Sequence, residues 1–137
     1  MMEITKEFDF DAAHWLPEVP ADHKCRRLHG HTYRVVVMCS GIVGPMSGMV
    51  VDYADIAKAW APLHDLLDHR CLNGVPPGMG CPEQFPVLKN PTTENLAALI
   101  VDKLRIALPS FSGVRVYEFA TTYAELRLPA PQAARKE

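Results

Sequence analysis

The segment Cys25–Val37, with the sequence CRRLHGHTYRVVV, decides the fold because it combines a strand pattern with two closely spaced imidazoles. Its second half alternates between two sets of residues, which is typical of a β-strand with one buried face. This strand is expected over residues 29–43 and opens with His29-Gly30-His31. Side chains two residues apart point to the same face of a strand, so the two rings should project side by side. The segment therefore predicts a core strand that begins with a pair of potential metal ligands.

The preceding segment, residues 2–14, shows the same alternation, and its last residue, His14, has the parity of the aromatic residues that should face the core. Residues 15–28 carry two prolines and many charges, which indicates a loop. If the two strands pair antiparallel across this loop, His14 faces His29 and His31. Three imidazoles with one open position are typical of a catalytic zinc site, and zinc needs no redox partner. The alternative is a polar strand end beside an ordinary core histidine.

Two helices and two further strands complete the expected architecture. Asp52 should cap a helix over residues 53–67, which Pro62 is expected to kink or split. Thr92 should cap a second helix over residues 93–108. The other segments are a turn at 44–48, a loop at 70–91, strands at 114–120 and 122–128, and a frayed tail at 129–137. The order β-β-α-α-β-β favours an α+β fold in which helices cover one face of an antiparallel sheet.

The composition is that of an ordinary globular chain. Its 137 residues suit a single domain spanning residues 1–137, and 48% of them are apolar, which is enough to form a core. The 14 Lys and Arg against 16 Asp and Glu argue against a nucleic-acid binder or a polybasic membrane binder. No apolar run approaches the roughly 18 residues of a membrane span, and the N-terminus is too charged for a signal peptide. We therefore expect a cytoplasmic protein whose four cysteines are free thiols.

Cys25 is a candidate catalytic base because it stands in the basic run Lys24-Cys25-Arg26-Arg27. Nearby cations favour a thiolate, and so would a divalent metal in the vicinity. A thiolate beside a metal site is able to remove a proton from an adjacent carbon or oxygen. Two alternatives remain open: a surface cysteine with basic neighbours, or a fourth metal ligand.

Three further groups carry potential chemistry. Asp68-His69 ends the first helix, where a carboxylate would raise the basicity of the imidazole and fix its tautomer. Its alternative is a histidine that complements the helix dipole. Glu118 shares the parity of two core valines, so its carboxylate needs a partner, such as the N–H groups of a guanine or pterin ring. His23 and His64 have no comparable setting and are treated as ordinary.

Five motifs occur in one order along the chain: FDAAHWLP, CRRLHGH, LDHRCLN, NPTTENLA and VYEFAT. As a set they resemble the 6-pyruvoyltetrahydropterin synthase superfamily over nearly the whole chain. Cys25 lies four residues before His29, and this spacing resembles the queuosine-pathway branch, the 6-carboxy-5,6,7,8-tetrahydropterin synthases. Two departures are a longer loop over residues 74–89 and a last strand, TTYAELRL, without the expected glycine turn.

The resemblance implies a role for each candidate residue. It implies zinc ligation by His14, His29 and His31, proton abstraction by Cys25, a relay through Asp68 and His69, a pterin anchor at Glu118, and pocket contacts from Thr92 and Thr93. Lys24, Arg26 and Arg27 are candidates for contacts to a triphosphate, by simple electrostatics. The implied fold is the T-fold, a four-stranded antiparallel sheet with two helices on one face. Such subunits assemble into barrels, so a homo-oligomer, with a hexamer suspected, is expected to share active sites between subunits.

The implied reaction converts 7,8-dihydroneopterin triphosphate into 6-carboxy-5,6,7,8-tetrahydropterin, acetaldehyde and triphosphate, with zinc as the cofactor. Zinc would acidify the hydroxyl groups of the substrate side chain as a Lewis acid. One alternative is triphosphate elimination from the same substrate to give 6-pyruvoyltetrahydropterin. Others are a non-catalytic pterin- and zinc-binding module, or an oligomeric structural protein with incidental histidines.

Overall fold

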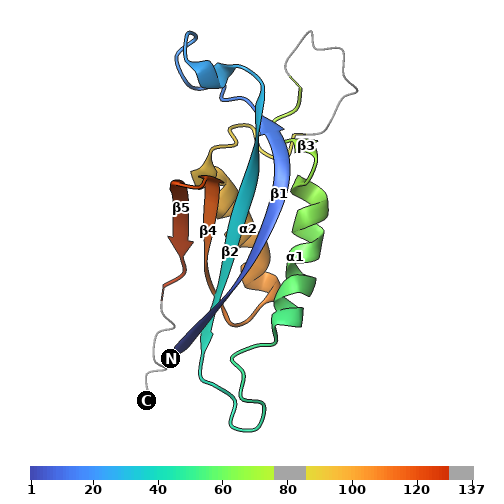
Figure 1. The fold of residues 1–137 in the computed structure, drawn as a ribbon, viewed down its shortest axis with the longest axis vertical. Coiled ribbons are helices and arrows are strands. Elements are labelled where there is room, and N and C mark those ends of the chain that lie inside the picture. The colour runs from blue at the N-terminus through green and yellow to red at the C-terminus, as the bar shows by residue number, and fades with distance from the viewer. Residues whose placement is uncertain (76–85, 130–137) are drawn as a thin grey trace, which may run out of the picture.

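The computed structural model describes residues 1–75 and 86–129, which form a β-sheet with two helices packed on one face (Figure 1). The strands are β1 (Met2–His14), β2 (His29–Gly41), β3 (Arg70–Cys71), β4 (Phe111–Phe119) and β5 (Thr122–Arg127), in the sheet order β3-β1-β2-β4-β5. The helices are α1 (Tyr53–Leu67) and α2 (Thr93–Ala107), and a 3-10 turn, η1 (Lys24–Arg26), lies between β1 and β2. Within the described ranges, no helix is long and apolar enough to cross a membrane.

The predicted pairing of the first two strands is confirmed. β1 and β2 run antiparallel in an unbroken register from Met2 opposite Gly41 to His14 opposite His29. This register brings the end of β1 and the start of β2 to the same edge of the molecule. There is little room for a side chain at Gly30, because a Cβ at this position would lie 3.3 Å from the carbonyl oxygen of Ala12.

The core lies between the sheet and the two helices. Phe10 stacks on Tyr33 at 4.8 Å between ring centroids, and Trp60 of α1 stacks on Phe8 at 5.1 Å. Fully buried aliphatic residues of both helices and of the central strands fill the remaining space, among them Ile56, Leu67, Leu96, Ile100, Val35 and Val114. Each such side chain contributes about 1.5–3 kcal/mol through burial. The prediction that the helices cover one face of the sheet is therefore confirmed.

The sheet differs from the four-stranded antiparallel prediction, because residues 70–71 form a fifth strand inside the segment expected to be a loop. β3 pairs parallel with β1, with Arg70 opposite Ala12 and Cys71 opposite Ala13. Two residues are too few to show an alternating pattern, so no sequence signal marks this strand. It is created by the position of the end of α1 beside β1, where the main-chain amide of Leu72 donates to the carbonyl of Ala13 at 2.8 Å.

Of the two effects predicted for Pro62, a kink or a split, the split is wrong, because α1 is one helix from Tyr53 to Leu67. Pro62 lies on the exposed face, between the buried side chains of Trp60 and Leu63. A proline there leaves the carbonyl of Lys58 without its helical donor, and an exposed carbonyl is satisfied by water. The caps at Asp52 and Thr92 are confirmed, since their side chains accept from Ala54 N and Asn95 N.

Other boundaries shift by one to three residues. β2 ends at Gly41 rather than at residue 43, α2 ends at Ala107 rather than 108, β4 begins at Phe111 rather than 114, and β5 ends at Arg127 rather than 128. The frayed tail expected over 129–137 and the long loop expected over 74–89 lie mainly outside the described residues. Cys81 also falls outside them, whereas Cys25 and Cys39 are free thiols, as predicted, and the Cys71 thiol donates to the carbonyl of Gly74 at 3.1 Å.

Candidate active site

Three histidines meet where β1 ends and β2 begins. The ring centroids of His14 and His29 lie 4.6 Å apart, those of His14 and His31 5.1 Å, and those of His29 and His31 4.9 Å. His14 is 1% exposed, and it lies on the face of the sheet that the helices cover. The convergence inferred from strand parity is therefore confirmed.

Main-chain carbonyl groups fix the orientation of two of these rings. Nδ1 of His14 lies 2.8 Å from the carbonyl oxygen of Pro91, and Nδ1 of His29 lies 2.6 Å from that of Arg27. A carbonyl oxygen only accepts, so each Nδ1 carries the proton and donates it. Nε2 of each ring is then the nitrogen that is left for a metal ion. Such second contacts are the usual way in which a protein orients metal-binding histidines.

Glu118 of β4 joins the three imidazoles. Its Oε1 atom lies 2.7 Å from Nε2 of His31 and 3.6 Å from Nε2 of His14, and its Oε2 atom accepts a hydrogen bond from the Thr93 hydroxyl at 2.8 Å. One ligand atom from each of His14, His29, His31 and Glu118 lies within 4.8 Å of the others. The sequence predicted Glu118 as a ligand anchor and did not place it among the metal-binding groups.

The neighbouring groups keep Glu118 ionised. His14 lowers the pKa of the Glu118 carboxyl to about 2, Thr93 and His31 act in the same direction, and burial opposes them. Burial lowers the pKa of His31, with Glu118 opposing that change. Burial also raises the pKa of Tyr33, whose neutral hydroxyl lies 3.3 Å from Nδ1 of His14. The site therefore combines three imidazoles with one ionised carboxylate beside an uncharged phenol hydroxyl.

This donor set fits a divalent metal ion. Nε2 of His31 is buried and has no aligned hydrogen-bond partner among residues 1–75 and 86–129, although Glu118 lies close to it. A buried polar atom without a partner is costly, and a metal ion would satisfy it. Imidazole nitrogens with a carboxylate oxygen suit zinc and its neighbours in the first transition row. The four residues are therefore able to hold a metal ion.

Cys25 lies in η1, within the loop that joins the two histidine-bearing strands. Its main-chain amide donates to Nδ1 of His23 at 3.0 Å, and its carbonyl accepts from the amide of Leu16 at 2.8 Å. The thiol is partly exposed and is not a member of the four-residue group. The alternative of Cys25 as a fourth metal ligand therefore has no support in the described residues. His23, treated as ordinary from the sequence, caps the turn that carries this cysteine.

The cations beside Cys25 differ in their availability. The Arg26 guanidinium donates to the carbonyl oxygens of Pro17 and Val19, which holds it within the loop. Lys24 and Arg27 are exposed. The two threonines differ in a similar way. The Thr92 hydroxyl caps α2, and Thr93 alone of the pair contacts Glu118.

Asp68 and His69 form a carboxylate–imidazole pair at the end of α1, as the sequence suggested. Oδ2 of Asp68 lies 2.7 Å from Nδ1 of His69, and Oδ1 accepts from the main-chain amide of Asp11 at 3.0 Å. His69 has a φ of 56°, so the helix has ended and the adjacent side chains are able to meet. His64, treated as ordinary, also faces Asp68, with Nε2 3.5 Å from Oδ2.

The contact between Asp68 and His69 changes the pKa of both groups. The Asp11 amide and then the His69 ring lower the pKa of the Asp68 carboxyl. The hydrogen bond to Asp68 raises the pKa of His69 above its ordinary 6.5. His69 is 78% exposed, so its ring is free to meet a substrate or another subunit.

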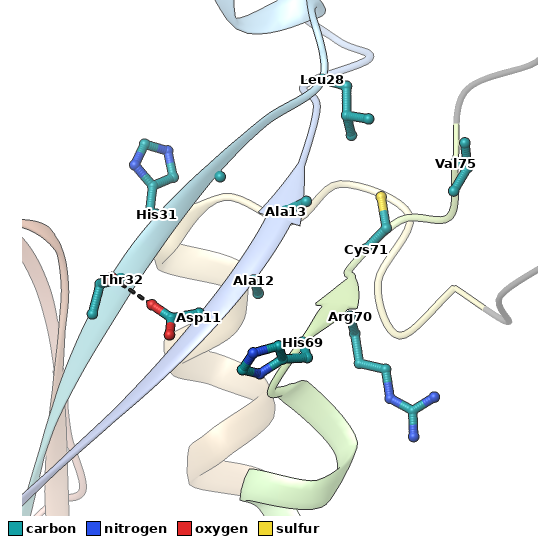
Figure 2. Close-up of a pocket in the computed structure, with 11 residues that line it drawn as sticks. Asp11, Ala12, Ala13, Leu28, His31, Thr32, His69, Arg70, Cys71 and Val75 are labelled. Carbon is teal, nitrogen blue, oxygen red and sulfur yellow. Dashed lines mark hydrogen bonds between the residues drawn. The ribbon is translucent and has the colours of Figure 1, made fainter. Parts of the chain in front are cut away.

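The Asp68–His69 pair lies apart from the metal-binding group of its own chain. A cavity of about 670 Å³ is lined by His31 on one side and by His69, Asp11 and Arg70 on the other. Figure 2 shows the His31 ring projecting away from His69, with β1 between them. His31 and His69 therefore lie on opposite sides of β1.

The sequence was compared with protein families and with known proteins. Residues 3–129 match the family model described as 6-pyruvoyl tetrahydropterin synthase. The chain belongs to the 6-pyruvoyl tetrahydropterin synthase family. It is 38% identical over 135 residues to the 6-carboxy-5,6,7,8-tetrahydropterin synthase of Synechocystis, covering 94% of this chain and 95% of that relative. It is 33% identical to the human 6-pyruvoyl tetrahydrobiopterin synthase, covering 85% of this chain and 84% of the relative.

The fold of the family is also found in solved structures. The Caenorhabditis elegans 6-pyruvoyl tetrahydropterin synthase superposes with a TM-score of 0.77 at 25% identity, covering 93% of this chain and 96% of that one. The T-fold expected from the resemblance is therefore confirmed in its helices and in the main strands of its sheet. The family resemblance read from the five motifs is likewise confirmed.

Proposed function

We propose that this family member is a zinc-dependent lyase that converts 7,8-dihydroneopterin triphosphate into 6-carboxy-5,6,7,8-tetrahydropterin, acetaldehyde and triphosphate, in queuosine biosynthesis. The observation that carries the proposal is the group formed by the three imidazoles and Glu118. The identity to relatives with that name, at 38% and 32%, supports this reaction. The sequence spacing of Cys25 and His29 supports the same branch.

The zinc ion would be held by His14, His29 and His31, and would supply Lewis acidity to the hydroxyl groups of the substrate side chain. The carbonyl contacts at Nδ1 of His14 and His29 leave Nε2 as the metal-binding nitrogen and support this assignment. Zinc is favoured over other metals because imidazole ligands suit it and the chemistry needs no change of oxidation state.

Cys25 would act as the base that removes a proton from the substrate side chain. Its position on the loop between the metal-bearing strands supports this role, because that loop begins and ends at metal-binding residues. His69 would carry the proton onward, with Asp68 holding its Nδ1 atom and thereby its tautomer. Lys24 and Arg27, exposed beside Cys25, would contact the triphosphate.

Glu118 would anchor the pterin ring by accepting its N–H groups. An ionised carboxylate is required for this role, and the lowered pKa of Glu118 supports it. Thr93 already orients the carboxylate through Oε2, which leaves Oε1 directed toward the histidines. Thr92, whose hydroxyl is used in the helix cap, would line the pocket without a hydrogen bond from that group.

A homo-oligomer would bring the separated parts together. His69 lies on the other side of β1 from His31, and the Asp68 carboxylate contacts the Asp11 amide and the His69 ring. This separation supports an assembly, with a hexamer suspected, in which the pair of one subunit completes the site of another. The single-domain organisation and the cytoplasmic setting expected from the sequence stay predictions.

The test is product identification by mass spectrometry after incubation of the zinc-loaded protein with 7,8-dihydroneopterin triphosphate. The proposal expects 6-carboxytetrahydropterin together with stoichiometric acetaldehyde and triphosphate. Triphosphate release with 6-pyruvoyltetrahydropterin and no acetaldehyde would favour the alternative reaction, which the human relative's name and the family description support. Pterin binding without triphosphate release would instead identify a non-catalytic module.

A further inference from the structure

Asn73 ends the LDHRCLN motif, and its side chain makes two hydrogen bonds to the main chain of Trp15. Its Nδ2 atom donates to the Trp15 carbonyl at 2.7 Å, and its Oδ1 atom accepts from the Trp15 amide at 3.2 Å. Both contacts are partly buried, and they join residues 58 positions apart in the chain. A carboxamide carries a donor and an acceptor side by side, so it pairs with a peptide group as a neighbouring strand would.

The Asn73 contact continues the pairing of β1 with β3 beyond the end of both strands. The amide of Leu72 donates to Ala13, and Asn73 then takes the next pair of main-chain groups with its side chain. The indole Nε1 atom of Trp15 donates to the carbonyl of Gly74 at 2.9 Å, which closes the same junction from the other side. We call Asn73 and Trp15, with these contacts, the Asn73 clamp.

The clamp joins the two segments that carry the proposed base and relay. One residue beyond Trp15, the Leu16 amide donates to the carbonyl of Cys25 at 2.8 Å. On the other side, Asn73 follows His69 by four residues, and the amide of His69 is fixed to the carbonyl of Asp11. Hydrogen bonds therefore connect Asn73, which follows β3, through Trp15 and Leu16 to the main chain of Cys25.

We propose that Asn73 is a positioning residue that fixes Cys25 relative to the metal-binding group, an inference that rests on the proposed function for its catalytic consequence. Without the clamp, the loop keeps its ends at His14 and His29 but loses the contact that sets its first residue. A displacement of about 1 Å in a catalytic group lowers turnover by about 100-fold while leaving binding largely intact. The role is distinct from holding the metal, since Asn73 contacts none of the four metal-binding residues in the described structure.

The test compares Asn73→Ala with the wild type in the full-length zinc-loaded protein. We expect kcat to fall about 10- to 100-fold, with KM and zinc content close to those of the wild type. The rate at which iodoacetamide alkylates Cys25, followed by peptide mass spectrometry, should rise because the loop opens more often. Asn73→Asp keeps the acceptor and loses the donor, and is measured in the same way in case the alanine variant misfolds.

Two control variants separate positioning from general damage. Trp15→Phe keeps both Asn73 contacts to the main chain, loses the indole contact to Gly74, and should lower kcat less than Asn73→Ala does. Ser40→Ala removes a side-chain hydrogen bond to Ser112 at the opposite end of β2 and should change neither kcat nor alkylation. Unchanged kcat and alkylation in both Asn73 variants would overturn the proposal, as would a loss of activity explained by lost zinc or lowered Tm. If the wild type shows no turnover, the proposed function fails, and the alkylation rates alone still decide whether Asn73 positions Cys25.

Discussion

His14, the last residue of β1, lies directly opposite His29, the first residue of β2, and their ring centroids are 4.6 Å apart. This single cross-strand pair links the fold to the proposed chemistry. The same register that places apolar residues in the core also places the imidazoles at one end of the sheet. Changes to the register at this end should therefore affect metal binding before they affect the fold as a whole.

The closeness of the two strands at Gly30 gives a first prediction. In Gly30→Ala the new Cβ would lie 3.3 Å from the main-chain oxygen of Ala12, so β1 and β2 must separate beside the metal-binding residues. We expect zinc affinity to fall, measured by competition with a chelator. Gly41→Ala is the matched control at the other end of β2, where the new Cβ meets the Val50 side chain at the same 3.3 Å. Equal zinc affinity in the two variants would contradict the argument.

Replacing the proposed base should separate binding from turnover. Cys25→Ala should keep one zinc per chain and bind a pterin normally, because the thiol is not part of the metal-binding group. Turnover should be abolished, since general-base catalysis typically contributes about 100- to 10,000-fold and the cysteine is the proposed proton acceptor. Metal analysis, pterin titration and product assays check the three statements. Retained turnover would remove Cys25 from the mechanism.

The charge of Glu118 should matter more than its size. Glu118→Gln keeps a similar shape but loses the anionic acceptor for the pterin N–H groups. A hydrogen bond to a charged group contributes about 1.5–3 kcal/mol, so pterin affinity should fall about 10- to 150-fold. Calorimetric titration with a pterin that is not a substrate measures the change in affinity. Glu125→Gln, which affects the ion pairs with Arg115 and Arg127 at the far strand, should leave pterin affinity as it was.

The Asp68–His69 pair predicts a pH dependence. Asp68 raises the pKa of His69 above 6.5, so Asp68→Asn should lower that pKa and move the limb of the pH–rate profile set by His69 to lower pH. Titration of the His69 ring by NMR measures the shift directly. Asp65→Asn, an exposed change on the same helix, is the control. An unchanged His69 titration in Asp68→Asn would show that the hydrogen bond to Asp68 does not raise the pKa of His69.

The contribution of the Asp68–His69 pair to the stability of the fold depends on pH. Because the folded-state pKa of His69 is raised, its stabilisation is complete below about pH 6.5 and is lost as the pH rises through the folded-state value. The pKa of Asp68 is lowered, so its stabilisation is present above about pH 3.8 and is lost as the pH falls through its folded-state value. Comparison of Tm between the wild type and Asp68→Asn should show the largest difference between these limits.

The histidine cluster was predictable because two local patterns agree. Strand parity places His14, His29 and His31 on one face, and antiparallel pairing across the loop at residues 15–28 brings the strand ends together. The helix starts were predictable from Asp52 and Thr92, whose capping chemistry is local. These features depend on neighbours in sequence.

Features that depend on distant pairing were not predictable in the same way. Glu118 joins the metal-binding group only through the register of β4 against β2, for which no local signal exists. β3 is two residues long, and it forms because α1 ends beside β1. Pro62 is accommodated inside α1 because the carbonyl that loses its helical donor faces water. The contact of His64 with Asp68 follows from helical spacing and was accessible in principle.

Zinc ligation by His14, His29 and His31 is tested by zinc X-ray absorption spectroscopy on the purified protein, combined with metal analysis. The account predicts one zinc per chain with about three imidazole nitrogens at about 2.0–2.1 Å and light oxygen donors completing the shell. A sulfur ligand at about 2.3 Å would show that Cys25 binds the metal instead of acting as a base. Protein that binds no zinc, or binds it without histidine, would contradict the account.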